Sequence, residues 1–118
     1  MNNDCCLVDK HAMKKLFLIF LAFVSFQVFA QDNQNITLAY EYYNQGDREK
    51  ALEMFDKLSA NPANIPFIHE RYLELMLGNL EYEKAEKYLL KQKNANPDNH
   101  QYWIDLGSLY YQQNQEDK

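Results

Sequence analysis

The sequence has little glycine and no spaced cysteines. Only 3 of its 118 residues are glycine, which nearly excludes the glycine-rich loops that bind nucleotide phosphates. The 2 cysteines are adjacent, at Cys5 and Cys6, so they offer no framework for disulfides or for zinc. The 12 Lys and Arg are outnumbered by 17 Asp and Glu, which argues against a nucleic-acid partner. The length allows one small domain.

An uncharged apolar segment, residues 16–29, follows Lys14 and Lys15 directly and ends at Ala30. This order of a basic, an apolar and a small-residue region is typical of a secretory signal peptide cleaved after Ala30. The segment is about 14 residues long, short of the roughly 20 that a membrane-spanning helix needs, although an uncleaved anchor is the alternative. We expect a periplasmic or secreted protein that contacts the membrane only during export.

Met13 stands just before the lysines, where a bacterial-type signal usually begins. We therefore interpret residues 1–12 as an upstream extension from a misassigned start and residues 13–30 as the signal peptide. Residues 31–118 are then the mature domain.

Apolar and small residues recur every 34 positions in the mature domain. Leu38, Tyr72 and Leu106 share one column, and Ala51 and Ala85 share another. Within each unit the apolar residues are spaced by three and four, which predicts helices with one buried face. No alternating pattern favours strands. The predicted helices are 32–44, 47–60, 65–78, 81–94 and 99–113.

Helix breakers fall between the predicted helices. Gly46 is suited to a left-handed C-cap and Asp47 to the next N-cap. Gly78 with the residue after it is expected to make the equivalent turn one unit later. Pro62 and Pro97 are expected to end the second helix of each unit, because proline cannot continue a helix.

The period resembles the tetratricopeptide repeat. Pro97, Trp103, Leu106-Gly107 and Tyr110 stand at the spacing of that family, whereas Leu80 replaces its turn glycine. The resemblance implies an all-α fold, a short right-handed α-solenoid with full repeats at about 32–65 and 66–99 and a partial one at 100–118. The residues expected to pack the repeats are Leu38, Ala39, Tyr42, Ala51, Phe55, Tyr72, Leu73, Met76, Ala85, Leu89, Trp103, Leu106, Gly107 and Tyr110.

No catalytic or metal-binding set emerges from the mature sequence. His69 and His100 are its only histidines, and with no cysteine partner they fail the usual zinc spacings. We expect His69 to be a semi-buried packing residue and His100 to lie in the first turn of a helix. The sequence predicts no enzyme activity, no cofactor and no small-molecule substrate.

The family resemblance implies a concave groove lined by the first helix of each unit. Its aromatic, aliphatic and acidic side chains would suit a peptide or helix of another protein, such as one with a basic residue. Ile36, Glu70 and Ile104 replace the lysines with which some family members clamp a terminal carboxylate, so no such clamp is expected. The alternative is that the exposed aromatic residues are ordinary repeat residues. The predicted groove residues are Ile36, Tyr40, Tyr43, Phe67, Glu70, Glu74, Leu77, Ile104, Ser108 and Tyr111.

The predicted function is a non-catalytic scaffold that binds a partner protein or peptide. The third unit stops after its first helix, which is either a terminal cap or the front of a longer array. Four residues are typical of interior residues that need a cover: Trp103, Leu106, Leu109 and Tyr110. The alternatives are therefore an N-terminal module of a longer enzyme, sensor or assembly protein, or a module for self-association.

Overall fold

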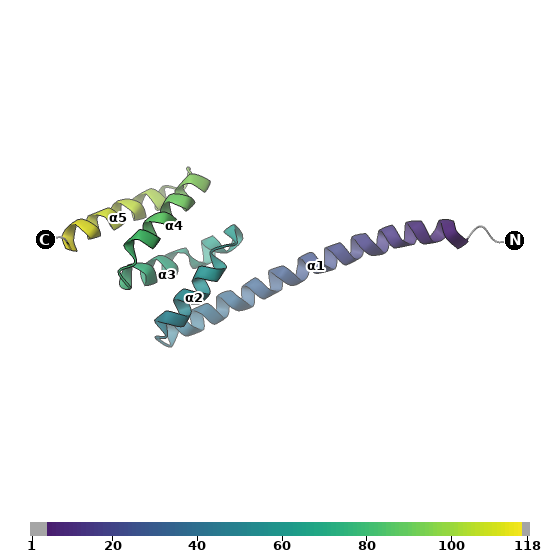
Figure 1. Cartoon of the computed structure of the whole chain (residues 1–118), viewed down its shortest axis with the longest axis horizontal. Helices are drawn as coiled ribbons and strands as arrows, with labels where there is room; N and C mark the ends of the chain where they lie inside the picture. Colours follow the sequence, from purple (N-terminus) through teal and green to yellow (C-terminus); the bar gives the residue numbers. More distant parts are fainter. Residues whose placement is uncertain (1–4, 117–118) are drawn as a thin grey trace.

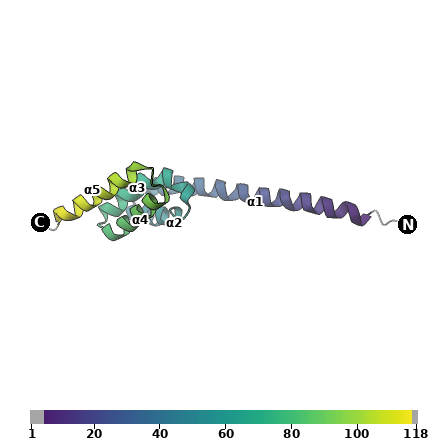
Figure 2. The same cartoon turned by 90° about the horizontal axis from the view of Figure 1, so that it is seen from above.

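A computed structural model describes the backbone of residues 5–116 and the side chains of residues 10–23 and 31–114. Every regular element in the described backbone is a helix, so the predicted all-α class is confirmed. Each helix packs mainly on the next one along the chain, as Figures 1 and 2 show. The elements are α1 (Cys5–Asn44), α2 (Arg48–Leu58), the 3-10 helix η1 (Pro62–Asn64), α3 (Ile65–Gly78), α4 (Tyr82–Ala95) and α5 (His100–Glu116).

The predicted and observed helices differ most at the N-terminus. The helix expected to begin at Asp32 is the last part of α1, which runs unbroken from Cys5 because no proline or glycine interrupts residues 5–44. The sequence pattern does not predict the short η1. Pro62 stands in its first turn, and the Asn61 side chain caps it by accepting a hydrogen bond from the Ala63 amide at 3.1 Å.

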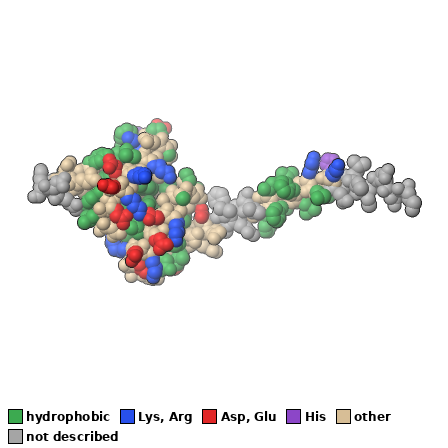
Figure 3. Space-filling view, viewed as in Figure 1, with side chains coloured by type: hydrophobic (Ala, Val, Ile, Leu, Met, Phe, Trp, Pro, Cys, Tyr) green, Lys and Arg blue, Asp and Glu red, His purple; other side chains and the backbone are tan. Residues whose placement is uncertain are grey.

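The first half of α1 extends away from the other helices (Figure 1). All described side chains of residues 10–23 are exposed, and Figure 3 shows apolar side chains over part of this extension, next to a group of basic ones. No helix in the described part of the chain is both long and apolar enough to cross a membrane. The side chain of Ala30, the predicted cleavage residue, lies outside the described residues.

The turn after α1 has a left-handed glycine, as predicted. Gly46 has a φ of 80°, and its amide donates to the Tyr43 carbonyl at 3.1 Å while the Asp47 amide donates to the Tyr42 carbonyl at 3.0 Å. These two bonds form a Schellman cap. The Asp47 side chain then caps α2 by accepting from the Lys50 amide at 3.2 Å.

The turn after α3 repeats both bonds one unit later. The Leu80 amide donates to the Leu77 carbonyl at 3.0 Å and the Glu81 amide to the Met76 carbonyl at 2.9 Å. The prediction that Gly78 makes this turn is wrong, because Gly78 is still helical and Leu80 takes the left-handed conformation with a φ of 60°. The second turn therefore has the same backbone conformation as the first, although leucine replaces glycine at the left-handed position.

One apolar core runs through all five α-helices, and every one of its fully buried members lies between Ala39 and Leu109. Of the expected packing residues, these are buried: Ala39, Ala51, Phe55, Tyr72, Met76, Ala85, Leu89 and Leu106. Tyr42 and Leu73 are partly buried against the same core.

Four expected packing residues are exposed instead: Leu38, Trp103, Gly107 and Tyr110. Leu38 occupies the column of Tyr72, whose ring contacts Phe55 of the preceding helix α2. No earlier helix packs on α1 in the described structure, so Leu38 has no such cover. The other three lie on α5, and no described helix follows α5.

Candidate functional site

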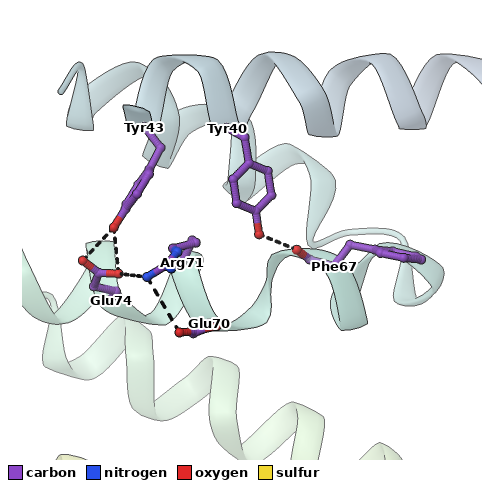
Figure 4. Close-up of polar contacts among 6 residues, drawn as sticks. All are labelled: Tyr40, Tyr43, Phe67, Glu70, Arg71 and Glu74. Carbon is purple, nitrogen blue, oxygen red and sulfur yellow. Dashed lines mark hydrogen bonds and ion pairs between the residues drawn. The ribbon is translucent and has the colours of Figure 1, made fainter. Parts of the chain in front are cut away.

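Two tyrosines fill the junction between α1 and α3. The Tyr40 hydroxyl donates to the Phe67 carbonyl at 2.6 Å, and the Tyr43 hydroxyl lies 2.8 Å from both carboxylate oxygens of Glu74 (Figure 4). The Tyr40 ring also packs edge-on against the buried ring of Phe55. This first junction is therefore closed by aromatic side chains whose hydroxyls are satisfied.

A single arginine pairs with the two glutamates beside this junction. Arg71 Nη1 lies 2.9 Å from Glu74 Oε2 and 3.7 Å from Glu70 Oε1, and its guanidinium lies over the Tyr43 ring (Figure 4). The hydrogen bond from Tyr43, followed by that from Arg71, lowers the pKa of Glu74. Glu74 is thus a carboxylate held by two partners, whereas the Glu70 side chain is 82% exposed.

An open hollow of about 580 Å³ separates α3 from α5. Its position follows from the repeat period, because Tyr40 is replaced one unit later by Glu74 and Tyr43 by Leu77. These shorter side chains leave unfilled the space that the tyrosines occupy in the first junction. The residues that line the hollow are His69, Glu70, Leu73, Glu74, Leu77, Gln101 and Asp105.

The hollow combines an apolar floor with an acidic rim. Leu73 and Leu77 supply the apolar surface. Glu70, Glu74 and Asp105 supply three carboxylates, and the adjacent Arg71 offsets part of that charge. The excess negative charge would favour a cationic group over an anionic one.

His69 and Asp105 connect α3 to α5 at one side of the hollow. His69 Nε2 lies 2.8 Å from Asp105 Oδ2, and His69 Nδ1 lies 2.9 Å from the hydroxyl of the buried Tyr88. The Gln101 side chain donates to the other Asp105 oxygen at 2.8 Å. A histidine oriented by an aspartate is half of a hydrolase triad, but here the second ring nitrogen meets a buried tyrosine rather than an accessible nucleophile.

The structure brings together only part of the predicted groove. Glu70, Glu74 and Leu77 line the hollow. Tyr40 and Tyr43 are partly buried in the first junction, and Phe67 is exposed at its edge. Ile36 is partly buried against the core. Ile104, Ser108 and Tyr111 are exposed on α5 but do not line the hollow.

Sequence reasoning missed His69, Leu73, Gln101 and Asp105 as lining residues. The repeat period could have indicated two of them, Gln101 and Asp105. They lie one unit after Phe67 and Arg71, which contact residues of α1. The predicted groove uses positions that are equivalent in the repeat, one period apart, on all three helices. In the structure, neighbouring helices contact each other through positions that are not equivalent in the repeat.

The described residues contain no group of three or more His, Cys, Asp and Glu side chains placed to hold a metal ion. In the comparisons with known proteins, no family model, no curated protein and no solved structure matches this chain.

Proposed function

We propose that this protein is a non-catalytic scaffold that binds a segment of another protein in the hollow between α3 and α5. The observation that carries the proposal is the contrast between the two junctions. Tyr40 and Tyr43 close the first, whereas the second is open, with an apolar floor and an acidic rim. Exposed apolar surface with a polar rim is a common form of protein interaction site.

We further propose that residues 31–118 form a tetratricopeptide-like stack in a short right-handed α-solenoid. The support is that the period recurs in backbone hydrogen bonds as well as in side chains. The pair of bonds that closes the turn at Gly46 recurs at Leu80. The buried columns Ala51 with Ala85 and Phe55 with Leu89 recur at the same offset.

The proposed ligand segment carries a basic side chain beside an apolar one. An apolar side chain placed against Leu73 and Leu77 would contribute about 1.5–3 kcal/mol if fully buried. A lysine or arginine paired with the exposed Glu70 would add about 0.2–1 kcal/mol, as exposed ion pairs do. The apolar contact would therefore supply most of the affinity, and the carboxylates would select the charge and speed association.

The absence of catalytic activity is part of the proposal. Both ring nitrogens of His69 already have partners, Tyr88 and Asp105, within the described structure. A general base must reach the proton that it removes, and this imidazole is engaged on both sides.

Export outside the cytoplasm is proposed from the apolar segment that precedes the packed helices. The described part of that segment, up to Phe23, is exposed and separate from the core, which begins at Ala39. Its removal after Ala30 would therefore leave the core complete.

A displayed library of random peptides, selected on residues 31–118, tests the proposed function. We expect the enriched peptides to share a Lys or Arg next to a large apolar residue. Glu70→Lys should weaken their binding, and Glu83→Lys, on an exposed position of α4, is the matched control that should not. Failure to enrich any peptide, or equal binding to both variants, would contradict the proposal.

A further inference from the structure

Helix α5 lies at the end of the described bundle (Figures 1 and 2). Its aromatic residues Trp103 and Tyr110 remain exposed. Trp103 is 53% exposed and Tyr110 is 40% exposed. Between them lies Gly107, where an added Cβ would meet no atom within 4 Å. We call Trp103, Gly107 and Tyr110 the α5 end face. Beside this face α5 packs on α4 and buries Leu106 and Leu109.

The corresponding face of α3 is covered. His69, Leu73 and Met76 hold the positions one unit before the three residues of the α5 end face. Met76 is fully buried, Leu73 is partly buried, and the His69 ring stacks on Tyr88 of α4 with a centroid distance of 5.6 Å. Helix α4 thus covers part of this face, while His69 also contacts Tyr102 and Asp105 of α5 and Leu73 borders the hollow.

The same face of α1 is covered by the helix that follows it. Ala39 and Tyr42 hold the positions one unit before Leu73 and Met76. Ala39 is fully buried, Tyr42 is partly buried, and α2 packs along this part of α1. Of the three equivalent faces, only the one on α5 lacks a covering helix in the described structure.

The two covering helices share one pattern. Each buries an alanine followed one turn later by a large apolar residue: Ala51 and Phe55 in α2, Ala85 and Leu89 in α4. A small residue allows two helix axes to approach closely, and the large residue fills the space beside it. A helix with this small-then-large apolar pattern therefore packs well on the faces of α1 and α3.

We propose that the α5 end face is a second interaction site, which binds an amphipathic helix of a partner protein. The partner helix would carry a small residue followed one turn later by a large apolar residue, and it would lie on α5 as α4 lies on α3. The site is distinct from the hollow between α3 and α5. A second copy of this chain could not supply the matching residues of α2 or α4, because Ala51, Phe55, Ala85 and Leu89 are already buried within their own copy.

The two aromatic rings of the face are already held in place. Lys93 Nζ lies 4.4 Å from the centre of the Trp103 ring, and Trp103 Nε1 donates to the Pro97 carbonyl at 3.4 Å. The Tyr110 hydroxyl donates to Glu86 Oε1 at 2.5 Å. A surface whose side chains are ordered before binding loses less conformational entropy when a partner binds.

Trp103 is the only tryptophan of the chain, so its fluorescence reports on this face directly. The probe is a synthetic peptide with the sequence of α4, residues 82–95, stapled on its polar side because isolated helices of this length are marginal in water. The matched control peptide has arginine in place of the residues equivalent to Ala85 and Leu89. We expect the first peptide to shift the Trp103 emission to the blue and to bind at least tenfold more tightly than the control.

Two variants separate binding at this face from other effects. Gly107→Glu should weaken the α4 peptide at least tenfold without unfolding the chain, because the added side chain points into open space and glycine is a poor helix former. Ser108→Glu, one exposed position further on, should bind as the wild type does. Glu70→Lys, in the hollow, should also leave this binding unchanged.

The proposal is overturned if the α4 peptide and its control act alike, or if Gly107→Glu binds the α4 peptide as tightly as the wild type. It is also overturned if the Trp103 emission shifts with protein concentration alone while sedimentation shows dimers. That result would assign the face to a second copy of the chain.

Discussion

His69 of α3 and Asp105 of α5 are joined across the sequence by a 2.8 Å contact between Nε2 and Oδ2. Both side chains are largely buried, at 15% and 16% exposure. The contact lies at the side of the hollow and fixes the spacing of the two helices that line it. Hydrogen bonds in such partly dry positions are costly to break when one partner is left behind.

Asp105→Ala is expected to destabilise the fold by about 1.5–3 kcal/mol, the range for hydrogen bonds to charged groups. The change leaves His69 Nε2 and the Gln101 amide without their acceptor. Amide hydrogen exchange should accelerate most in α5. Asp98→Ala, at an exposed residue before α5, is the control and should change little. Equal exchange rates in the wild type and Asp105→Ala would show that the contact does not hold α5.

Leu80→Gly is expected to stabilise the protein. A left-handed residue other than glycine costs about 1–2 kcal/mol, and part of this is offset because glycine loses more entropy on folding. Leu80 is 63% exposed, so little burial is lost, and we expect a net gain of about 0.5–1 kcal/mol in the free energy of unfolding. Urea denaturation measures it.

Gly46→Ala is the mirror control for that change, because Gly46 holds the same position of the preceding turn with a φ of 80°. It should lose about 1 kcal/mol. If both substitutions shift stability in the same direction, the equivalence of the two turns is wrong.

The free energy of unfolding should fall above about pH 10, the usual pKa of tyrosine. Burial, and next the hydrogen bond to Asp56, raises the pKa of Tyr72, and burial raises that of Tyr88. Above pH 10 the unfolded chain releases these protons while the folded chain keeps them, so stability present below pH 10 is lost as pH rises. Each group contributes a slope of up to about 1.4 kcal/mol per pH unit.

Tyr72→Phe should reduce that slope, which urea denaturation between pH 8 and 11 measures. Tyr111→Phe, at an exposed residue of α5, is the control and should keep the wild-type slope. An unchanged slope in Tyr72→Phe would mean that Tyr72 does not contribute to the alkaline loss.

Leu77→Tyr should close the hollow. Leu77 holds the position of Tyr43 one unit later, so the substitution places in the second junction the side chain that fills the first. We expect peptides selected on the wild type to bind at least tenfold more weakly, with the midpoint of unfolding nearly unchanged. Leu77→Met keeps the apolar volume and should keep binding. Undiminished binding to Leu77→Tyr would place the peptide site elsewhere.

Helices α2 to α5 and the turn at Gly46 could be predicted from the sequence because spacing and caps are local signals. The bounds of α2 to α5 follow from breakers such as Pro62 and Pro97. The resemblance places Leu80 at the position of the turn glycine, but the preference of leucine gives no signal for a left-handed conformation. Its conformation is set by the bonds at Leu77 and Met76, which outweigh the preference of the residue itself.

The hollow was only partly predictable, because it depends on how two helices are offset. Glu70, Glu74 and Leu77 are predicted as first-helix residues, and they line it. Gln101 and Asp105 lie on the facing side of α5, and no spacing within α5 alone indicates which of its polar residues turn toward α3. One unit later, Glu74 stands in place of Tyr40 and Leu77 in place of Tyr43. These replacements indicate an open junction only once the structure shows that the tyrosines close the first one.

The binding site is tested most directly by a ¹⁵N–¹H chemical-shift titration of residues 31–118 with a peptide enriched in the library selection. We expect the signals of Tyr40 and Tyr43 to move little. The largest shifts should fall on residues that line the hollow: Glu70, Leu73, Leu77, Gln101 and Asp105. Shifts concentrated on other surfaces, with these residues unmoved, would contradict the central claim that the open junction between α3 and α5 is the binding site.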